Sequence, residues 1–289
     1  MKCGYVAVLG RPNAGKSSLI NRLVGEDVAI VTKRQQTTRN NILGIVTNKA
    51  YQIIFIDTPG IHHSKNKLDK YMMKNVRSAI GSCDVAIYLI DASRELDDEE
   101  LDYIKMLKEK AEKLLVVLNK IDKKLVAKVD ANLKISVQEN INIDKLVEEI
   151  VKLLPERQMI YDEDAFTDKS INFLICEHIR GLLLEKLDNE IPHGVAVIVD
   201  KVSETSDKVF MDISIIVEKE RHKGFIIGKN GVFIKEIGIS AREYAESLFR
   251  KQVVLHLFVK VDENWRVNNI NKYGYWYILS HNTKACIFC

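Results

Sequence analysis

The chain has 289 residues, of which 46% are hydrophobic and 29% charged, and its formal net charge is +3. The length suits two ordinary domains, and the composition is typical of a soluble globular protein. No apolar run approaches the roughly 20 residues that a bilayer-spanning helix needs. The net charge is too small to indicate nucleic-acid binding by itself.

The five cysteines are an odd and scattered set, and the first residues lead directly into a predicted strand. We therefore expect a cytosolic protein with free thiols and without a secretory signal. Cys286 and Cys289 form a lone C-x-x-C pair near which only His281 could add a ligand. A zinc site needs four ligands, so we expect an incidental tail.

The first half of the chain alternates short apolar runs with helical patterns. Runs that are apolar on both faces lie at residues 6–9, 52–56, 85–90 and 114–118. They predict an α/β fold whose mostly parallel sheet has helices on both faces. Residues 41–47 predict an edge strand that runs antiparallel to the second run. A helix at 144–154 is expected to close this unit before Pro155.

The second half has a different rhythm. Residues 156–168 are polar and acidic, and we predict a linker there. The order that follows is helix, strand, strand, helix, helix, strand, which indicates an α+β domain. The expected elements lie at 171–187, 195–202, 209–217, from the glycine pair at 228–231 through 237, at 240–250 and at 253–261.

A phosphate-binding loop follows the first strand and opens a helix. Its G-x-x-x-x-G-K-S sequence consists of Gly10, Arg11, Pro12, Asn13, Ala14, Gly15, Lys16 and Ser17. The two glycines let backbone N–H groups turn toward phosphates, Lys16 adds a positive charge, and Ser17 offers a hydroxyl to Mg²⁺. Because a strand precedes the loop and a helix follows it, a chance glycine turn is a poor explanation.

A second nucleotide motif follows the next buried run and consists of Asp57, Thr58, Pro59 and Gly60. Asp57 is predicted to hold Mg²⁺ through water beside Ser17, and the backbone of Gly60 to sense the γ-phosphate. Thr38 is the favoured switch threonine that closes on Mg²⁺, and Thr37 is the alternative.

A third motif, Asn119-Lys120-Ile121-Asp122, ends the fourth run and predicts guanine recognition. The Asp122 carboxylate could accept hydrogen bonds from the guanine N1–H and 2-amino group, which adenine lacks. Lys120 is expected to lie along the base and Asn119 to tie this loop to the phosphate loop. The backbone N–H groups of Ser136 and Val137 are expected to face the guanine O6.

A fourth motif, G-x-x-G, lies between apolar flanks in the second half. Alone it indicates only a tight turn, but in this order of elements it resembles a type II KH module, which clamps a single-stranded backbone. The predicted RNA-binding residues are Lys223, Ile227, Gly228, Lys229, Asn230, Gly231, Ile234, Lys235 and Arg242.

Together these motifs resemble the Era family within the translation-factor-related GTPases, over nearly the whole chain. The segments at 36–39, 237–242 and 272–275 are similar to that family, as is Trp265. The residue after D-T-P-G is Ile61, and the water-orienting glutamine of Ras-like enzymes is absent. Val137 departs from the family's usual alanine, the segment between Asp122 and Ser136 is short, and residues 276–289 extend past the usual end.

The resemblance implies a slow GTPase that uses GTP, GDP and Mg²⁺, with catalysis assigned to Lys16, Thr38, Gly60 and Asn13. In relatives, an asparagine at the Asn13 position helps to bind a stimulating K⁺. The resemblance also implies contact with the 3′ end of small-subunit ribosomal RNA during assembly of that subunit. Peripheral membrane contact is a further implication, and we expect a monomer.

We predict a GTPase domain at 1–155, a linker at 156–168, a KH domain at 169–275 and a tail of unassigned role at 276–289. One alternative is a non-catalytic, GTP-gated RNA clamp, which the absent glutamine keeps open. Another is the GTPase subunit of an RNA-modifying complex, for which the sequence offers no further cofactor site. His62 and His63 are expected to be switch residues rather than a base or metal pair.

Overall fold

The computed structural model describes residues 1–32, 38, 41–61, 67–187, 194–263 and 265. The chain divides into two compact units, Met1–Asp168 and Lys169–Cys289. Several residues of the sequence motifs lie outside the described residues, namely Gln36, Thr37, Arg39, His62, His63, the 272–275 segment and the 276–289 tail.

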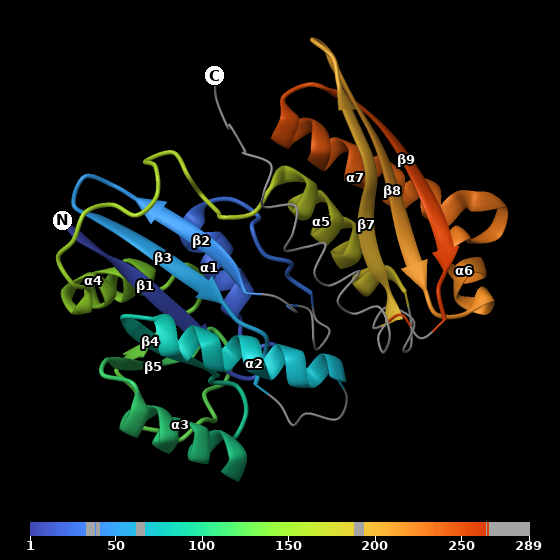
Figure 1. Ribbon diagram of the computed structural model, residues 1–289. Helices are drawn as coiled ribbons and strands as arrows, with labels where there is room; N and C mark the ends of the chain where they lie inside the picture. The colour runs from blue at the N-terminus through green and yellow to red at the C-terminus, as the bar shows by residue number, and fades with distance from the viewer. Residues whose placement is uncertain (33–37, 39–40, 62–66, 188–193, 264, 266–289) are drawn as a thin grey trace. The chain divides into compact units, whose positions relative to one another are not determined.

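The first unit is built on a six-stranded sheet of order β2-β3-β1-β4-β5-β6 (Figure 1). All neighbours pair in parallel except β2 and β3. The strands are β1 (Lys2–Leu9), β2 (Ile42–Thr47), β3 (Tyr51–Asp57), β4 (Val85–Asp91), β5 (Leu114–Asn119) and β6 (Leu133–Lys134). The predicted turn between β2 and β3 is present, and Asn48 Oδ1 accepts hydrogen bonds from the backbone N–H groups of Ala50 and Tyr51 at 2.8 and 2.9 Å.

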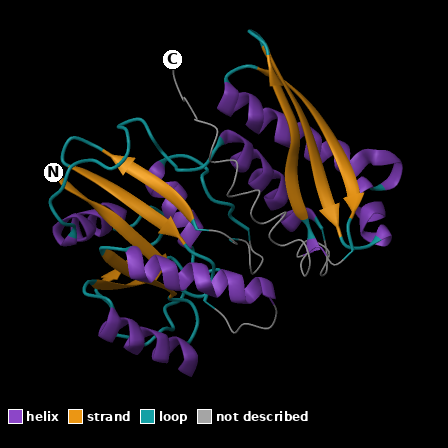
Figure 2. Ribbon diagram, viewed as in Figure 1, coloured by secondary structure: helices purple, strands orange, loops and turns teal. Residues whose placement is uncertain are grey.

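Helices cover both faces of this sheet, so the predicted α/β architecture is confirmed (Figure 2). They are α1 (Lys16–Val24), α2 (Lys67–Ser82), α3 (Asp98–Lys110) and α4 (Ile143–Leu153). One face packs Ala7 and Tyr88 against Val76 of α2 and Leu107 of α3. The carboxyl ends of β1, β3, β4 and β5 share one edge, which therefore collects the loops that carry the nucleotide motifs.

The segment predicted as a linker lies along the first unit. Its backbone bridges to β1 at Glu156 and to β2 at Thr167. The amide of Gln52 also ties it to β3, because its Oε1 accepts from the N–H groups of Ile160 and Tyr161 at 2.8 and 3.0 Å. The acidic composition of the segment did not indicate these contacts.

The second unit has a three-stranded sheet of order β7-β8-β9, in which β7 and β8 are antiparallel and β8 and β9 parallel. Its elements are α5 (Ile171–Lys186), β7 (Ala196–Glu204), β8 (Lys208–Val217), α6 (Glu220–Ile227), a 3₁₀ turn (Lys229–Gly231), α7 (Val232–Phe249) and β9 (Gln252–Val261). The three helices share one core with one face of the sheet, through Ile179, Ile226 and Ile237 among others.

The predicted order of elements is present, but the two middle helices differ from the prediction. The first is α6, which precedes the glycine pair, and the second is α7, which runs unbroken through Gly238. Only Ile226 of α6 is buried, so its sequence carries little apolar periodicity. The predicted break near Gly238 is wrong, and a Cβ there would lie 3.6 Å from Leu257 of β9, in ordinary contact.

Among the described residues, no helix combines the length and the apolar character needed to cross a bilayer. The described cysteines, Cys3, Cys83 and Cys176, are free thiols, as predicted. Cys286 and Cys289 lie outside the described part of the chain.

Candidate functional site

The phosphate loop joins β1 to α1 and wraps around the side chain of Lys16. Gly10 and Gly15 have φ values of 141° and 100°, a region that favours glycine. A Cβ on Gly10 would lie 2.3 Å from the backbone oxygen of Leu89, so no side chain fits there. Lys16 Nζ donates to the carbonyl oxygens of Gly10 and Arg11 at 3.1 and 3.0 Å. The lysine ammonium is thus held by backbone carbonyl groups of the loop.

Three side chains that were predicted to bind magnesium converge beside Lys16. Ser17 Oγ and Thr38 Oγ1 donate to Asp57 Oδ2 at 2.7 and 3.1 Å, and the two hydroxyl oxygens lie 3.2 Å apart. They come from α1, from the segment before β2 and from the end of β3. Residues far apart in sequence therefore bring three oxygen donors to one point.

This donor set fits Mg²⁺, which prefers oxygen ligands and keeps several waters. The second oxygen of Asp57, Oδ1, is buried and has no hydrogen-bond partner among the described residues. A buried carboxylate oxygen without a partner is costly, and a cation would satisfy it. Thr37, the alternative switch threonine, lies outside the described residues.

Burial shifts the pKa values of both charged groups in this centre. It lowers the pKa of Lys16 to about 8, although the nearby Asp57 carboxylate acts in the opposite direction. It also raises the pKa of Asp57, and Lys16, Ser17 and Thr38 offset only part of that effect. Each charge is therefore poorly solvated without a ligand, and a phosphate with its cation would stabilise both.

The D-T-P-G segment runs close to the phosphate loop. The hydroxyl of Thr58 donates to the Val8 carbonyl oxygen at 2.7 Å. The backbone N–H of Ile61 donates to the Gly10 carbonyl oxygen at 3.1 Å, which places Gly60 next to the loop. This hydrogen bond joins the D-T-P-G segment to the phosphate loop.

The N-K-x-D loop is attached to the phosphate loop by two hydrogen bonds. Asn119 Nδ2 donates to the Ala14 carbonyl oxygen at 2.8 Å, and Lys120 Nζ donates to the Asn13 carbonyl oxygen at 2.6 Å. Lys120 also pairs with Asp91 Oδ2 at 2.6 Å. Asp91 ends β4 and was not singled out in the sequence, because one carboxylate after a strand has no specific pattern.

Asp122 is oriented by the next loop, where Ser136 Oγ donates to its Oδ1. The backbone N–H groups of Ser136 and Val137, which the sequence predicts to face the guanine O6, donate hydrogen bonds within these loops in this structure. They donate to the Ile141 carbonyl oxygen and to Asn119 Oδ1, each at 3.1 Å, and so are not directed at a base. Satisfying backbone donors within the loop is the physical reason. The side chain of Ser136 orients Asp122, the carboxylate predicted to read the base.

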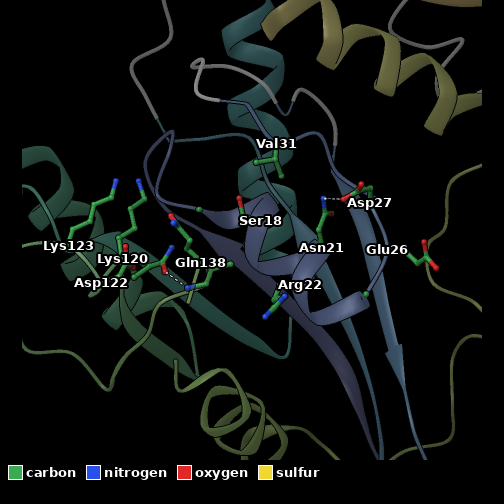
Figure 3. A pocket seen from close by; sticks show the side chains of 14 residues that line it. Ser18, Asn21, Arg22, Glu26, Asp27, Val31, Lys120, Asp122, Lys123 and Gln138 are labelled. Carbon is green, nitrogen blue, oxygen red and sulfur yellow. Dashed lines mark hydrogen bonds between the residues drawn. The ribbon is translucent and has the colours of Figure 1, made fainter. Parts of the chain in front are cut away.

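A cavity of about 700 Å³ opens between α1 and these loops (Figure 3). Lys120, Lys123 and Asp122 lie together at one end, and Asn21 and Asp27 lie toward the other. The lining residues are Gly15, Ser18, Asn21, Arg22, Gly25, Glu26, Asp27, Val31, Asn119, Lys120, Asp122, Lys123, Val137 and Gln138. A cavity of this size suits a nucleoside adjoining the phosphate cradle.

One wall of this cavity was missed in the sequence. Asn21 of α1 exchanges two hydrogen bonds with the backbone of Ala29, at 2.8 and 3.0 Å. These bonds hold residues 25–31 against α1 and place Val31 at the cavity. A lone asparagine within a helical pattern gives no signal of such a contact.

The G-x-x-G segment of the second unit forms an exposed turn between α6 and α7. Gly228 has φ 73°, and a Cβ there would lie 2.6 Å from Phe233 Cβ. Lys229 and Asn230 are exposed at the tip, with Asn230 at φ 54°. The turn thus offers backbone and a positive charge to solvent, as a phosphate backbone would require.

The remaining predicted RNA contacts lie on the two helices that flank this turn. Lys223 and Ile227 are half-buried on α6, Ile234 is half-buried on α7, and Lys235 and Arg242 are exposed on α7. Lys235 and Arg242 are seven residues apart, so they lie on the same face of α7. Exposed Phe225 and Val232 adjoin the turn and add apolar surface that was not predicted.

Both units match families of known proteins. The family model described as "50S ribosome-binding GTPase" matches residues 5–120, and the KH domain model matches residues 190–266. The chain is 42% identical to GTPase Era of Thermoanaerobacter pseudethanolicus, over 95% of this chain and 96% of that protein. It is 40% identical to GTPase Era of Clostridium acetobutylicum, over 92% and 94% respectively.

Two solved structures of Era match nearly the whole chain. Era in complex with MgGDPNP and nucleotides 1506–1542 of 16S ribosomal RNA matches with a TM-score of 0.89 and 33% identity, covering 95% of this chain and 99% of that one. Aquifex aeolicus Era bound to GDP and aluminium fluoride matches with a TM-score of 0.88 and 34% identity, with the same coverage.

Proposed function

Because this chain belongs to the Era family of GTPases, we propose that it binds and hydrolyses GTP in its first unit and binds single-stranded ribosomal RNA in its second. The observation that carries the first part is the convergence of Ser17, Thr38 and Asp57 beside Lys16. The second part is supported by the exposed G-x-x-G turn between two helices. The proposed RNA is the 3′ end of the small-subunit RNA, with which a similar Era has been solved.

The domain bounds follow from this proposal. Residues 1–155 form the GTPase domain, and residues 169–275 form the KH domain. Residues 156–168 connect them. The contacts of this segment with β1, β2 and β3 support the proposal that it packs along the first unit. No role is proposed for residues 276–289.

The triphosphate is held by the phosphate loop, from Gly10 through Ser17, with Lys16 directed at the β- and γ-phosphates. Ser17, Thr38 and Asp57 would hold Mg²⁺, which when bound neutralises developing charge on the phosphates. Asp122 reads the guanine edge, Lys120 lies along the base, and Asn119 fixes both to the phosphate loop. Ser136 orients Asp122. These roles divide the named residues between the phosphate end and the base end of the nucleotide.

Hydrolysis in this proposal depends on positioning. Thr38 and the backbone of Gly60 close around the γ-phosphate end and order the attacking water. No glutamine follows Gly60 to orient that water, so the intrinsic rate is slow. We propose that the side-chain oxygen of Asn13, an exposed residue of the loop, contributes to a K⁺ site, whose charge would stabilise the transition state as an arginine finger does.

Single-turnover release of phosphate tests this proposal. The full chain is in excess over GTP, and Mg²⁺ is present. We expect release in both salts and at least tenfold faster release in K⁺ than in Na⁺. Equal rates in the two salts would contradict the K⁺ site but not the GTPase assignment. Tight GTP binding without any release would instead favour the non-catalytic RNA clamp, and the GTPase assignment would then fail for this chain.

The wider setting is inferred from the family. We propose a monomer that acts in the cytoplasm during assembly of the small ribosomal subunit. Peripheral contact with the inner membrane face stays a prediction. An RNA-modifying partner enzyme is not favoured, because such a complex would need an additional cofactor site and the sequence offers none.

A further inference from the structure

The outer arm of the phosphate loop is held from outside by helix α3. Arg11 lies in that arm, and its Nη1 is 2.8 Å from Glu99 Oε2. Its Nη2 donates to Asp97 Oδ2. Only 20% of the Arg11 side chain is exposed. Two carboxylates at the N-terminus of α3 thus bind the guanidinium group of Arg11.

Asp97 is itself fixed at the start of α3, and Glu99 lies in the first turn of that helix. Asp97 is the N-cap residue, and its other oxygen, Oδ1, accepts from the backbone N–H of Glu100 at 2.9 Å. Glu100 is fully buried and pairs with Arg94 at 2.8 Å, which anchors this first turn in the unit. The hydrogen bonds from Glu100 and Arg11 outweigh burial and lower the pKa of Asp97, so it stays ionised. A carboxylate fixed in this way can position its partner.

The backbone of Arg11 links this contact to the phosphate cradle. The Arg11 carbonyl oxygen accepts one of the hydrogen bonds from Lys16 Nζ, at 3.0 Å. Fixing the Arg11 side chain therefore also fixes an acceptor that holds the phosphate-binding ammonium. A series of contacts therefore runs from the α3 carboxylates through Arg11 to Lys16, the residue proposed to bind the phosphates.

We propose that Asp97 and Glu99 are positioning residues for phosphate binding, which keep the Arg11–Asn13 arm ordered before the nucleotide arrives. This inference rests on the proposed GTP site, since it concerns how that site is prepared. A loop that is already ordered loses less conformational entropy on binding, so its ligand binds more tightly. Neither carboxylate needs to touch the nucleotide for this effect.

The test is calorimetric titration of the full chain in Mg²⁺ with GDP and with inosine diphosphate (IDP). The parent protein is compared with the double variant Asp97→Asn, Glu99→Gln. Asparagine still caps a helix, so α3 keeps its start while the charges are lost. We expect both affinities to fall about tenfold, with their ratio unchanged because the base end is untouched. The single variant Glu99→Gln should show part of this loss.

Two controls separate positioning from a general loss of stability. Asp98→Asn removes one exposed charge from the same helical turn and should leave both affinities unchanged. In an Arg11→Met background, the Asp97→Asn, Glu99→Gln change should cause no further loss. A capping role alone would persist in that background.

Unchanged GDP affinity in the double variant would overturn the positioning role, and so would an equal further loss in the Arg11→Met background. Failure of the parent chain to bind GDP at all would instead overturn the proposed function. The thermal unfolding midpoints of the ligand-free variants, measured alongside, show whether each one folds.

Discussion

At the scale of single residues, the site is defined by polar groups that are buried before a ligand binds. Lys16 and Asn119 are 6% and 2% exposed, and Asp57 is fully buried. Such groups destabilise a fold unless they are satisfied, and here the protein satisfies only part of them. Function is therefore maintained at a cost in stability, which substitutions can measure.

Lys16→Met should stabilise the ligand-free protein near neutral pH. The folded pKa of Lys16, about 8, lies below its ordinary value of 10.5, so the unfolded chain binds more protons between these values. The parent's stability should therefore rise relative to the variant as pH increases from about 8 to above 10. The change in this relative unfolding free energy between pH 7 and pH values above 10.5 is on the order of 3 kcal/mol.

Urea unfolding of both proteins across this pH range measures the effect, and GTP binding should be lost in the variant. Lys124→Met replaces an exposed lysine and should show no such pH-dependent gain. A constant difference in unfolding free energy from pH 7 to 10.5 would contradict the burial of a charged Lys16.

Asp122→Asn should change base preference from guanine to xanthine. The amide NH₂ donates where the carboxylate accepts. The variant therefore loses the hydrogen bond from the guanine 2-amino group and gains one to the 2-oxo group of xanthine. We expect GDP affinity to fall at least a hundredfold and XDP affinity to rise above it, as measured by calorimetry. Asp130→Asn, at an exposed carboxylate further along the chain, should alter neither affinity. Intact GDP affinity in Asp122→Asn would exclude the base-reading role.

At the scale of elements, much of the fold could be predicted, because burial on both faces leaves a plain record in the sequence. The strands β1, β3, β4 and β5 are continuous apolar runs, and β1, β3 and β5 lead directly into the nucleotide motifs. The short helix α6 left no such record, since only Ile226 is buried. The contacts of Arg11 with α3 and of Asn21 with Ala29 could not be predicted in the same way. They form only once the chain has folded, and the residues involved belong to no recognisable sequence pattern.

Lys229→Asp should weaken single-stranded RNA binding at least tenfold while leaving the fold intact. Lys229 is exposed at the tip of the turn between α6 and α7, where a carboxylate would repel phosphates. The slope of log affinity against log salt should fall by about 0.7 for one lost phosphate contact. Lys201→Asp makes the same charge change at an exposed site on β7 and should have a much smaller effect. Equal effects would indicate that only net charge matters.

At the scale of the whole molecule, the chain combines a nucleotide switch with an RNA-binding module. The segments around Thr38 and Gly60 meet the γ-phosphate end of the site, so they are the elements that GTP and GDP would distinguish. If these segments influence the RNA module, nucleotide and RNA must change each other's affinity by the same factor. Such coupling turns hydrolysis into a signal for RNA release.

The affinity of the full chain for a labelled single-stranded RNA with the 16S 3′-end sequence tests this claim most directly. Anisotropy titrations would be run in Mg²⁺ and K⁺ with saturating GDPNP or saturating GDP. The account predicts at least fivefold tighter RNA binding with GDPNP. Equal RNA affinities with the two nucleotides would contradict it.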